Sequence, residues 1–192
     1  MKKDIIRCPW CNLSNPKYVH YHDHQWGVPV YDDRELFEML ILEGAQAGLS
    51  WEIILNKKEA YQKAFDNFNP QIVAYYNDEK VEELCKDKGI VRNRLKIKSA
   101  IKNANVFLAI QSEFGSFATY LWSYVNHQPI VSNYKKLSQV PTSNDLSKAI
   151  SKDLKKRGMN FVGETIIFSY LEAIGVMNNH LVDCFKHPTK NQ

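Results

Sequence analysis

The fold is decided by residues 36–51, LFEMLILEGAQAGLSW, a strongly apolar stretch that carries one carboxylate, Glu43, in its middle. Asp32 and Asp33 precede it as residues that favour a helix N-terminus, and Gly48 is a plausible stop, so the pattern predicts a helix. Apolar side chains fall on opposite faces of that helix, so neither face is built for water. We therefore expect Glu43 to be buried or to lie at the floor of a pocket.

A buried Glu43 admits two interpretations. A carboxylate in an apolar setting is costly unless it is paired, hydrogen-bonded or used for chemistry, which makes Glu43 the first candidate functional residue. The alternative is a structural glutamate that reaches solvent from the last helical turn or accepts a hydrogen bond from a neighbouring backbone amide. The stretch alone leaves both interpretations open.

The rest of the chain predicts an all-α fold. No strand alternation or internal repeat is present, and residues 126–141 are turn-rich, which predicts a long loop at a lobe boundary. The first thirty residues are interrupted by proline and glycine too often for a long helix. Further helices are expected to begin near Ser50, Pro70, Asp78, Arg92, Ser116, Thr142 and Gly163.

Composition limits the class of protein. The chain has 192 residues, of which 44% are hydrophobic, with a net charge of +4, as in a globular protein of one domain or two small lobes. It lacks an apolar run of membrane-spanning length, and its start, MKKDIIRCPWC, lacks the apolar core of a signal peptide. We expect a cytoplasmic protein with no membrane partner, whose cysteines (Cys8, Cys11, Cys85 and Cys184) are metal ligands, reactive thiols or core residues.

A basic turn between two predicted helices is a candidate for binding phosphates. The sequence KKRGMNFVG places a tight turn, Gly158 to Gly163, after the cations Lys155, Lys156 and Arg157. Free backbone amides at the start of the following helix, flanked by positive charge, can hold a phosphate. The alternative is an ordinary helix corner whose basic side chains face water.

The two ends of the chain contain metal-ligand residue types. His180 and Cys184 are four residues apart and share one face if the chain is helical there, a suitable geometry for a tetrahedral metal. Their partners would come from Cys8, Cys11, His20, His22 and His24, in a segment with few aliphatic residues to bury. Two alternatives remain: Cys8 and Cys11 both bind the metal, or they form a redox pair, although no βαβ pattern supports the latter.

Seven motifs carry a resemblance that covers nearly the whole chain. In order they are RCPWC, YHDHQWGVP, LFEMLILEGAQAGLSW, WSYVNHQP, PTS, LKKRGMNFVG and NNHLVDC. Together they resemble the DNA-3-methyladenine glycosylase I family, constitutive bacterial repair enzymes of the helix-hairpin-helix superfamily. The resemblance implies one glycosylase unit over residues 1–192, with a base pocket between two helical lobes. It also implies a helix-hairpin-helix near 145–175 and zinc-binding segments at 8–22 and 180–184.

The resemblance also implies roles for individual residues. The family's base-recognising glutamate falls on Glu43, the loop that enters the duplex falls on Gly48 and Leu49, and the hairpin that holds the DNA backbone falls on residues 158–163. The pocket aromatics fall on Trp10, Tyr18, Tyr21, Trp26 and Trp51. One structural Zn²⁺ would be held by Cys8, His22, His180 and Cys184. Cys11, an extra thiol near the first ligand, leaves a choice between two cysteines.

The implied reaction is hydrolysis of the N-glycosidic bond of 3-methyladenine in double-stranded DNA. The free base is released, an abasic site remains, and the strand is not cut, since no lysine is among the proposed pocket residues. Most helix-hairpin-helix glycosylases have a catalytic aspartate where Asn178 stands, and its absence fits this family. The enzyme is expected to be a monomer. The alternatives are a non-enzymatic, zinc-stabilised DNA-binding module in which Glu43 is structural, and a hydrolase of free nucleosides.

Overall fold

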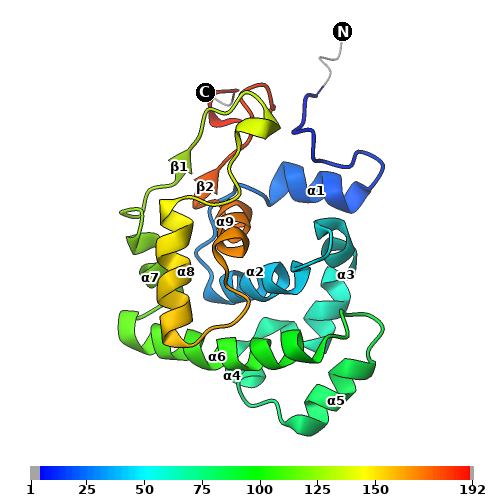
Figure 1. The fold of residues 1–192 in the computed structure, drawn as a ribbon. Coiled ribbons are helices and arrows are strands. Elements are labelled where there is room, and N and C mark those ends of the chain that lie inside the picture. Colours follow the sequence, from blue (N-terminus) through cyan, green and yellow to red (C-terminus); the bar gives the residue numbers. More distant parts are fainter. Residues whose placement is uncertain (1–4, 191–192) are drawn as a thin grey trace.

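The computed structural model describes residues 5–190 and is mainly helical (Figure 1). Two strands of two residues each, β1 (Ile130–Val131) and β2 (Met177–Asn178), form one parallel pair. Short 3₁₀ turns cover Asp66–Phe68, Leu137–Gln139 and Pro188–Lys190. The helices are α1 (Pro16–His24), α2 (Asp33–Gln46), α3 (Trp51–Ala64), α4 (Pro70–Val73), α5 (Asp78–Lys86), α6 (Arg94–Phe114), α7 (Phe117–Ser123), α8 (Asp145–Arg157) and α9 (Glu164–Ala173). The predicted helical class is confirmed.

Helix α2 occupies the centre of the molecule and packs against α3, α6, α7 and α9 (Figure 1). The Asp32 side chain caps it by accepting a hydrogen bond from the Glu35 amide at 3.0 Å. Leu36 and Phe37, adjacent in sequence and therefore on different sides of the helix, are both fully buried. The prediction that neither face of this helix meets water is confirmed.

One short helix was not predicted, and one predicted loop contains a strand. The first thirty residues contain a helix, α1, which begins where the Asn15 side chain caps it and Pro16 occupies its first turn, and ends before Gly27. Proline is tolerated at that first position, so it starts this helix instead of interrupting it. The stretch predicted as a loop contains β1, whose pairing with β2 is too short to produce an alternating pattern.

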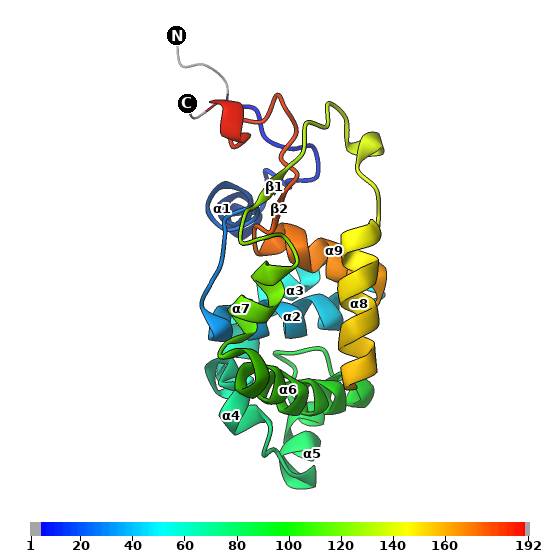
Figure 2. The same cartoon turned by 90° about the vertical axis from the view of Figure 1, so that its left-hand side faces the viewer.

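The first and last described segments lie at the same end of the molecule in both views (Figures 1 and 2). The amide of Phe185 donates a hydrogen bond to the carbonyl of Ile6 at 2.9 Å. This contact brings residues near position 8 beside residues near position 184. Among the described residues, no helix combines the length and apolar character needed to cross a bilayer.

Candidate active site and metal centre

A cavity of about 340 Å³ lies between the N-terminal segment with α1, the C-terminal half of α2, α9 and the loop before α8. This volume is at the small end of the range for ligand pockets, about 300–1,000 Å³. The indole of Trp10 lies 4.8 Å from that of Trp26, and the ring of Tyr21 lies 5.2 Å from that of Trp51 (centroid distances). All five predicted aromatics line the cavity: Trp10, Tyr18, Tyr21, Trp26 and Trp51.

Glu43 lines the same cavity from α2 and is only 4% exposed. Burial, with a smaller contribution from the negative charge of Glu172, raises the pKa of Glu43 to about 8. Within residues 5–190 its carboxyl group has no hydrogen-bond partner. Glu43 therefore faces the cavity and not the outer surface, and its role in recognising a base remains a prediction.

A second carboxylate, Glu172, lines the cavity from the last turn of α9 and was missed in the sequence analysis. Burial raises its pKa to about 7, although a hydrogen bond from Asn179 acts in the opposite direction. That bond joins Asn179 Nδ2 to Glu172 Oε1 at 2.7 Å. The signal that identified Glu43, a lone carboxylate in an apolar helix, is also present in IIFSYLEAIG and would have found Glu172.

The remaining lining residues were also absent from the sequence predictions. Thr165, Phe168 and Ser169 come from α9, and Gln46 lies at the end of α2. The loop before α8 contributes Leu137, Val140, Pro141 and Thr142, and Asn179 and Leu181 come from the C-terminal segment. Spacing in the sequence carries no information about which loop covers a cavity, so no local pattern indicates these residues.

The predicted duplex-entering loop borders this cavity. Gly48 and Leu49 line an adjoining depression of about 190 Å³, and Glu43 lines both spaces. Gly48 has a φ of +78°, a conformation that glycine adopts without strain, and Leu49 is 37% exposed. An exposed leucine on a tight turn beside the cavity has the position that a residue entering the duplex would need.

The turn between α8 and α9 is held by two sets of hydrogen bonds. The Ser151 hydroxyl donates to the Val162 carbonyl at 2.6 Å, and Asn103 exchanges two 2.9 Å bonds with the backbone of Asn160. Gly163, the N-cap of α9, supplies no side-chain acceptor, so the first amides of α9 are free to bind an anion. The two helices predicted on either side of this turn are present as α8 and α9, and the helix-hairpin-helix near 145–175 remains a prediction.

The three cations at the end of α8 have different surroundings. Lys155 and Lys156 are exposed, whereas Arg157 pairs with Glu113 at 2.6 Å and with Asp153 at 2.7 Å. These hydrogen bonds raise the pKa of Arg157 and hold its guanidinium over the ring of Tyr120, 5.3 Å from the centroid. Arg157 therefore has a structural role within the fold, and its contact with DNA remains a prediction.

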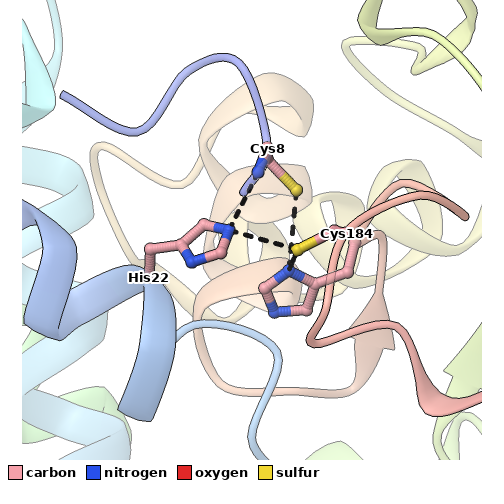
Figure 3. Close-up of side chains that lie close together, drawn as sticks. Cys8, His22 and Cys184 are labelled. Atoms are coloured by element: carbon pink, nitrogen blue, oxygen red, sulfur yellow. Dashed lines mark hydrogen bonds between the residues drawn. The ribbon is translucent and has the colours of Figure 1, made fainter. Parts of the chain in front are cut away.

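Four buried side chains converge at the junction of the two chain ends: Cys8, His22, His180 and Cys184. Their potential ligand atoms all lie within 4.8 Å of one another. Cys184 Sγ is 3.5 Å from His22 Nε2 (Figure 3). His180 Nδ1 lies 3.5 Å from Cys184 Sγ and 3.6 Å from Cys8 Sγ. Tetrahedral zinc would separate a sulfur ligand from a nitrogen ligand by about 3.6 Å, given its usual bond lengths. The cluster can therefore hold a metal ion.

Neighbouring groups orient both imidazoles. His22 Nδ1 lies 2.8 Å from Asp23 Oδ1, and His180 Nε2 lies 3.2 Å from the carbonyl oxygen of Trp26. Although partial burial acts against it, hydrogen bonds from Arg7 and His22 lower the pKa of Asp23. A carboxylate or carbonyl bonded to the outer imidazole nitrogen is typical of histidines that bind metals. In both residues the other ring nitrogen faces the cluster.

The structure separates Cys11 from this cluster. The Cys11 thiol points to the carbonyl of Tyr18 at 3.9 Å, and its amide closes a turn on the carbonyl of Cys8 at 3.0 Å. The chain is not helical between His180 and Cys184, so the condition for a shared helical face is not met; a turn closed by the bond from the Cys184 amide to the Leu181 carbonyl takes its place. Their side chains still converge because the turn reverses the chain.

Asn178 lies outside the cavity lining. Its Nδ2 donates to the carbonyl of Gly27 at 3.3 Å, and its Oδ1 accepts from the amide of His180 at 3.2 Å. The residue therefore joins the N-terminal segment to the C-terminal turn. An amide can make both bonds at once, whereas an ionised aspartate could make only the second.

Comparisons with known proteins agree over this span. A family model described as methyladenine glycosylase matches residues 10–187, which include every residue that lines the cavity. DNA-3-methyladenine glycosylase 1 of Escherichia coli (strain K12) is 47% identical over 182 residues, 95% of this chain and 97% of that protein. A crystal structure of 3-methyladenine DNA glycosylase I has a TM-score of 0.92 at 46% identity, covering 95% of this chain and 100% of the other. A variant of 3-methyladenine DNA glycosylase I in complex with 3-methyladenine has a TM-score of 0.88 at 42% identity. The match covers 91% of this chain and 94% of the other.

Proposed function

Because the chain belongs to the methyladenine glycosylase family, we infer that it hydrolyses the N-glycosidic bond of 3-methyladenine in double-stranded DNA. The family resemblance drawn from the sequence motifs is confirmed. The observation that carries the function is the aromatic cavity with Glu43 buried and unpartnered in its wall. The reaction releases the free base and leaves an abasic site. We further propose that the enzyme acts as a cytoplasmic monomer.

The chemistry of the lesion explains why so few groups are needed. A purine methylated at N3 carries positive charge in the nucleotide, so its glycosidic bond is weakened and the base departs neutral without receiving a proton. The target must leave the stack, and a lesion that pairs poorly reduces that cost of a few kcal/mol. The main tasks of the protein are to accept the extruded base and to favour a cation over a neutral purine.

The cavity wall suits a cation in two ways. Electron-rich rings attract positive charge through their faces, contributing about 0.5–2 kcal/mol for a good contact. The carboxyl group of Glu43, ionised in the presence of a cation, adds Coulomb attraction and accepts a hydrogen bond from the exocyclic amine. As the bond breaks, positive charge moves from the base to the sugar, so these groups select the lesion and hold the departing base weakly.

This mechanism predicts which bases the enzyme refuses. Hypoxanthine and 1,N6-ethenoadenine are neutral and keep stronger glycosidic bonds, and Asn178 is bound to backbone groups outside the cavity. We expect release of 3-methyladenine from duplex DNA and no appreciable release of either neutral base. Digestion of three duplexes that differ only in the lesion measures this selectivity. Efficient excision of a neutral base would contradict the mechanism while leaving the family assignment intact.

The same digestion separates the proposed function from its alternatives. A DNA-binding module without catalytic activity would release no base, and a nucleoside hydrolase would prefer a free nucleoside to the duplex. Borohydride trapping should give no covalent complex, because no lysine is among the described residues lining the cavity. A trapped complex would indicate a Schiff base and strand cleavage.

We propose that the four-residue cluster holds one structural Zn²⁺. Two thiols and two imidazoles are a common ligand set for structural zinc, and four protein ligands leave no position for substrate. The neighbouring Cys8 thiol lowers the pKa of Cys184, and the imidazoles of His180 and His22 act in the same direction. The ion would join the two chain ends beside Trp10 and Trp26 and thereby hold one wall of the cavity.

We propose that α8, α9 and their turn form the helix-hairpin-helix that binds the DNA backbone. Replacing Lys155 or Lys156 with alanine should weaken binding to a duplex with an abasic analogue. Each replacement should also reduce the slope of log affinity against log salt concentration by the equivalent of about one released ion. The measurement is affinity across a salt series. Lys86, in the last turn of the remote helix α5, is the matched control and should leave the slope unchanged. Salt-independent affinity in the wild type would show that the turn is only a helix corner.

A further inference from the structure

Two carboxylates from different helices face the cavity without a cation beside them. Glu43 comes from α2 and Glu172 from α9, and no other described lining residue is charged. Glu172 lies in the last helical turn, where the negative end of the helix dipole disfavours a carboxylate. Helix stability therefore does not account for a glutamate at this position, and its side chain borders the cavity.

The position of Glu172 is fixed at both backbone and side chain. Its carbonyl accepts a hydrogen bond from the Gly27 amide at 3.0 Å, and its Oε1 accepts the 2.7 Å bond from Asn179. Asn179 is itself buried and follows β2 directly. The carboxyl group is therefore held against the cavity and does not have the freedom of a surface glutamate.

Two buried polar atoms of lining residues have no partner in the described chain. They are Asn179 Oδ1, an acceptor, and Trp51 Nε1, a donor. Buried polar groups are normally hydrogen-bonded, so the wall of the cavity holds two polar atoms whose needs the free protein does not meet. Both atoms are covered in the free protein, so a bound base would reach them only after these side chains shift.

We propose that Glu172, held by Asn179, is a second specificity-determining carboxylate that faces the extruded base and, with Glu43, selects for its positive charge. This inference rests on the proposed function. Two carboxylates in one apolar cavity repel each other when both are ionised, and a bound cation removes that penalty. A neutral purine offers no such compensation.

The pKa values of the titratable groups that line the cavity fit a site that keeps carboxyl protons when empty and is charged when a cation is bound. Burial is the main cause that raises the pKa of Glu172 to about 7 and of Glu43 to about 8. The facing tyrosines, Tyr18 and Tyr21, also have raised pKa values, mainly through burial, and stay neutral. The empty cavity therefore keeps at least one carboxyl proton near neutral pH. Binding a cation should expel a proton, and binding a neutral purine should not.

The test uses a fixed cation and a neutral molecule of the same shape. The cation is 3,9-dimethyladeninium, and its neutral counterpart is 3,9-dimethyl-3-deazaadenine. Calorimetry on the full-length protein gives the dissociation constant of each, and buffers with different ionisation heats give the number of protons released. The ratio of the two dissociation constants measures charge preference separately from the shape of the cavity.

We expect Glu172→Gln to reduce the preference for the cation about tenfold or more, the effect of removing a charged hydrogen-bond partner. Its affinity for the neutral counterpart should stay the same. The matched control, Glu79→Gln, removes the same charge from an exposed position on α5 and should change neither constant. An unchanged charge preference in Glu172→Gln would overturn the proposal, because a merely structural residue would not alter this ratio.

A second measurement keeps the proposal falsifiable if Glu172→Gln does not fold. In Glu43→Gln, Glu172 is the remaining charged residue among the described lining, so cation binding near pH 7 should still release protons. Absence of proton release there would also overturn the proposal. Failure of the proposed function is a different result: wild-type protein would then release no 3-methyladenine from methylated duplex, whatever the variants bind.

Discussion

Replacing Cys184 with alanine is expected to remove the bound metal and to free the N-terminal segment from the C-terminal turn. Cys184 Sγ lies 3.5 Å from both imidazoles of the cluster, so its loss removes the thiol that contacts both histidines. Structural zinc supplies about 10–16 kcal/mol of apparent binding free energy in small zinc domains. Metal content should fall from near one equivalent to near zero, with faster proteolysis before α1.

The comparison among cysteine variants makes this prediction specific. Cys8→Ala should also lose the metal, whereas Cys11→Ala should keep it, because the Cys11 thiol points to the Tyr18 carbonyl. Metal analysis of the three purified variants gives the result directly. Full metal content in both Cys8→Ala and Cys184→Ala would exclude the proposed site. Loss of metal in Cys11→Ala, with metal kept in Cys8→Ala, would show that Cys11 is the ligand in place of Cys8.

Replacing Glu43 with glutamine is expected to reduce the kcat/KM for release of 3-methyladenine by about 10- to 100-fold, the range for a charged hydrogen bond. The side chain keeps its size but cannot attract a cation. Most of the loss should appear in KM, because the charge of the base is greatest before the bond breaks. Glu79→Gln on α5 is again the control. Unchanged kcat/KM in Glu43→Gln would remove Glu43 from the site.

The same substitution should stabilise the free protein at alkaline pH. The pKa of Glu43 is raised from 4.5 to about 8, so its ionisation opposes folding. Wild-type stability therefore falls as the pH rises from about 4.5 to 8, and Glu43→Gln should not share this loss. Above pH 8 the free energy of unfolding of the variant should exceed that of the wild type by roughly 3–5 kcal/mol, and below pH 4.5 the two should be similar. Denaturant unfolding at both pH values measures the difference, and a constant difference would contradict the burial argument.

Part of the site could be predicted because its signals are local. Residues 36–51 carry apolar side chains on both helix faces, which placed Glu43 in an apolar setting, and the structure then showed it to be buried. The turn at Gly158 could be predicted from the cationic residues followed by a glycine, and the structure gives that glycine a φ of +107°. Ligand types at the two ends of the chain predict a metal site, and the long motifs identify the family.

The choice of cysteine in the metal cluster and the partner of Arg157 depend on contacts between residues far apart in the sequence, so only tertiary packing could fix them. Cys8 enters the cluster and Cys11 does not because the turn that joins them directs the Cys11 thiol to Tyr18. Arg157 pairs with Glu113, which lies on a different helix.

The sequence by itself determined the helical class, an apolar setting for Glu43 and the chemistry available to the site. Tertiary structure alone decided that Glu172 faces the same cavity as Glu43. The physical reason is that propensity and periodicity act over one helical turn, whereas a cavity is closed by elements whose positions depend on the packing of the entire chain.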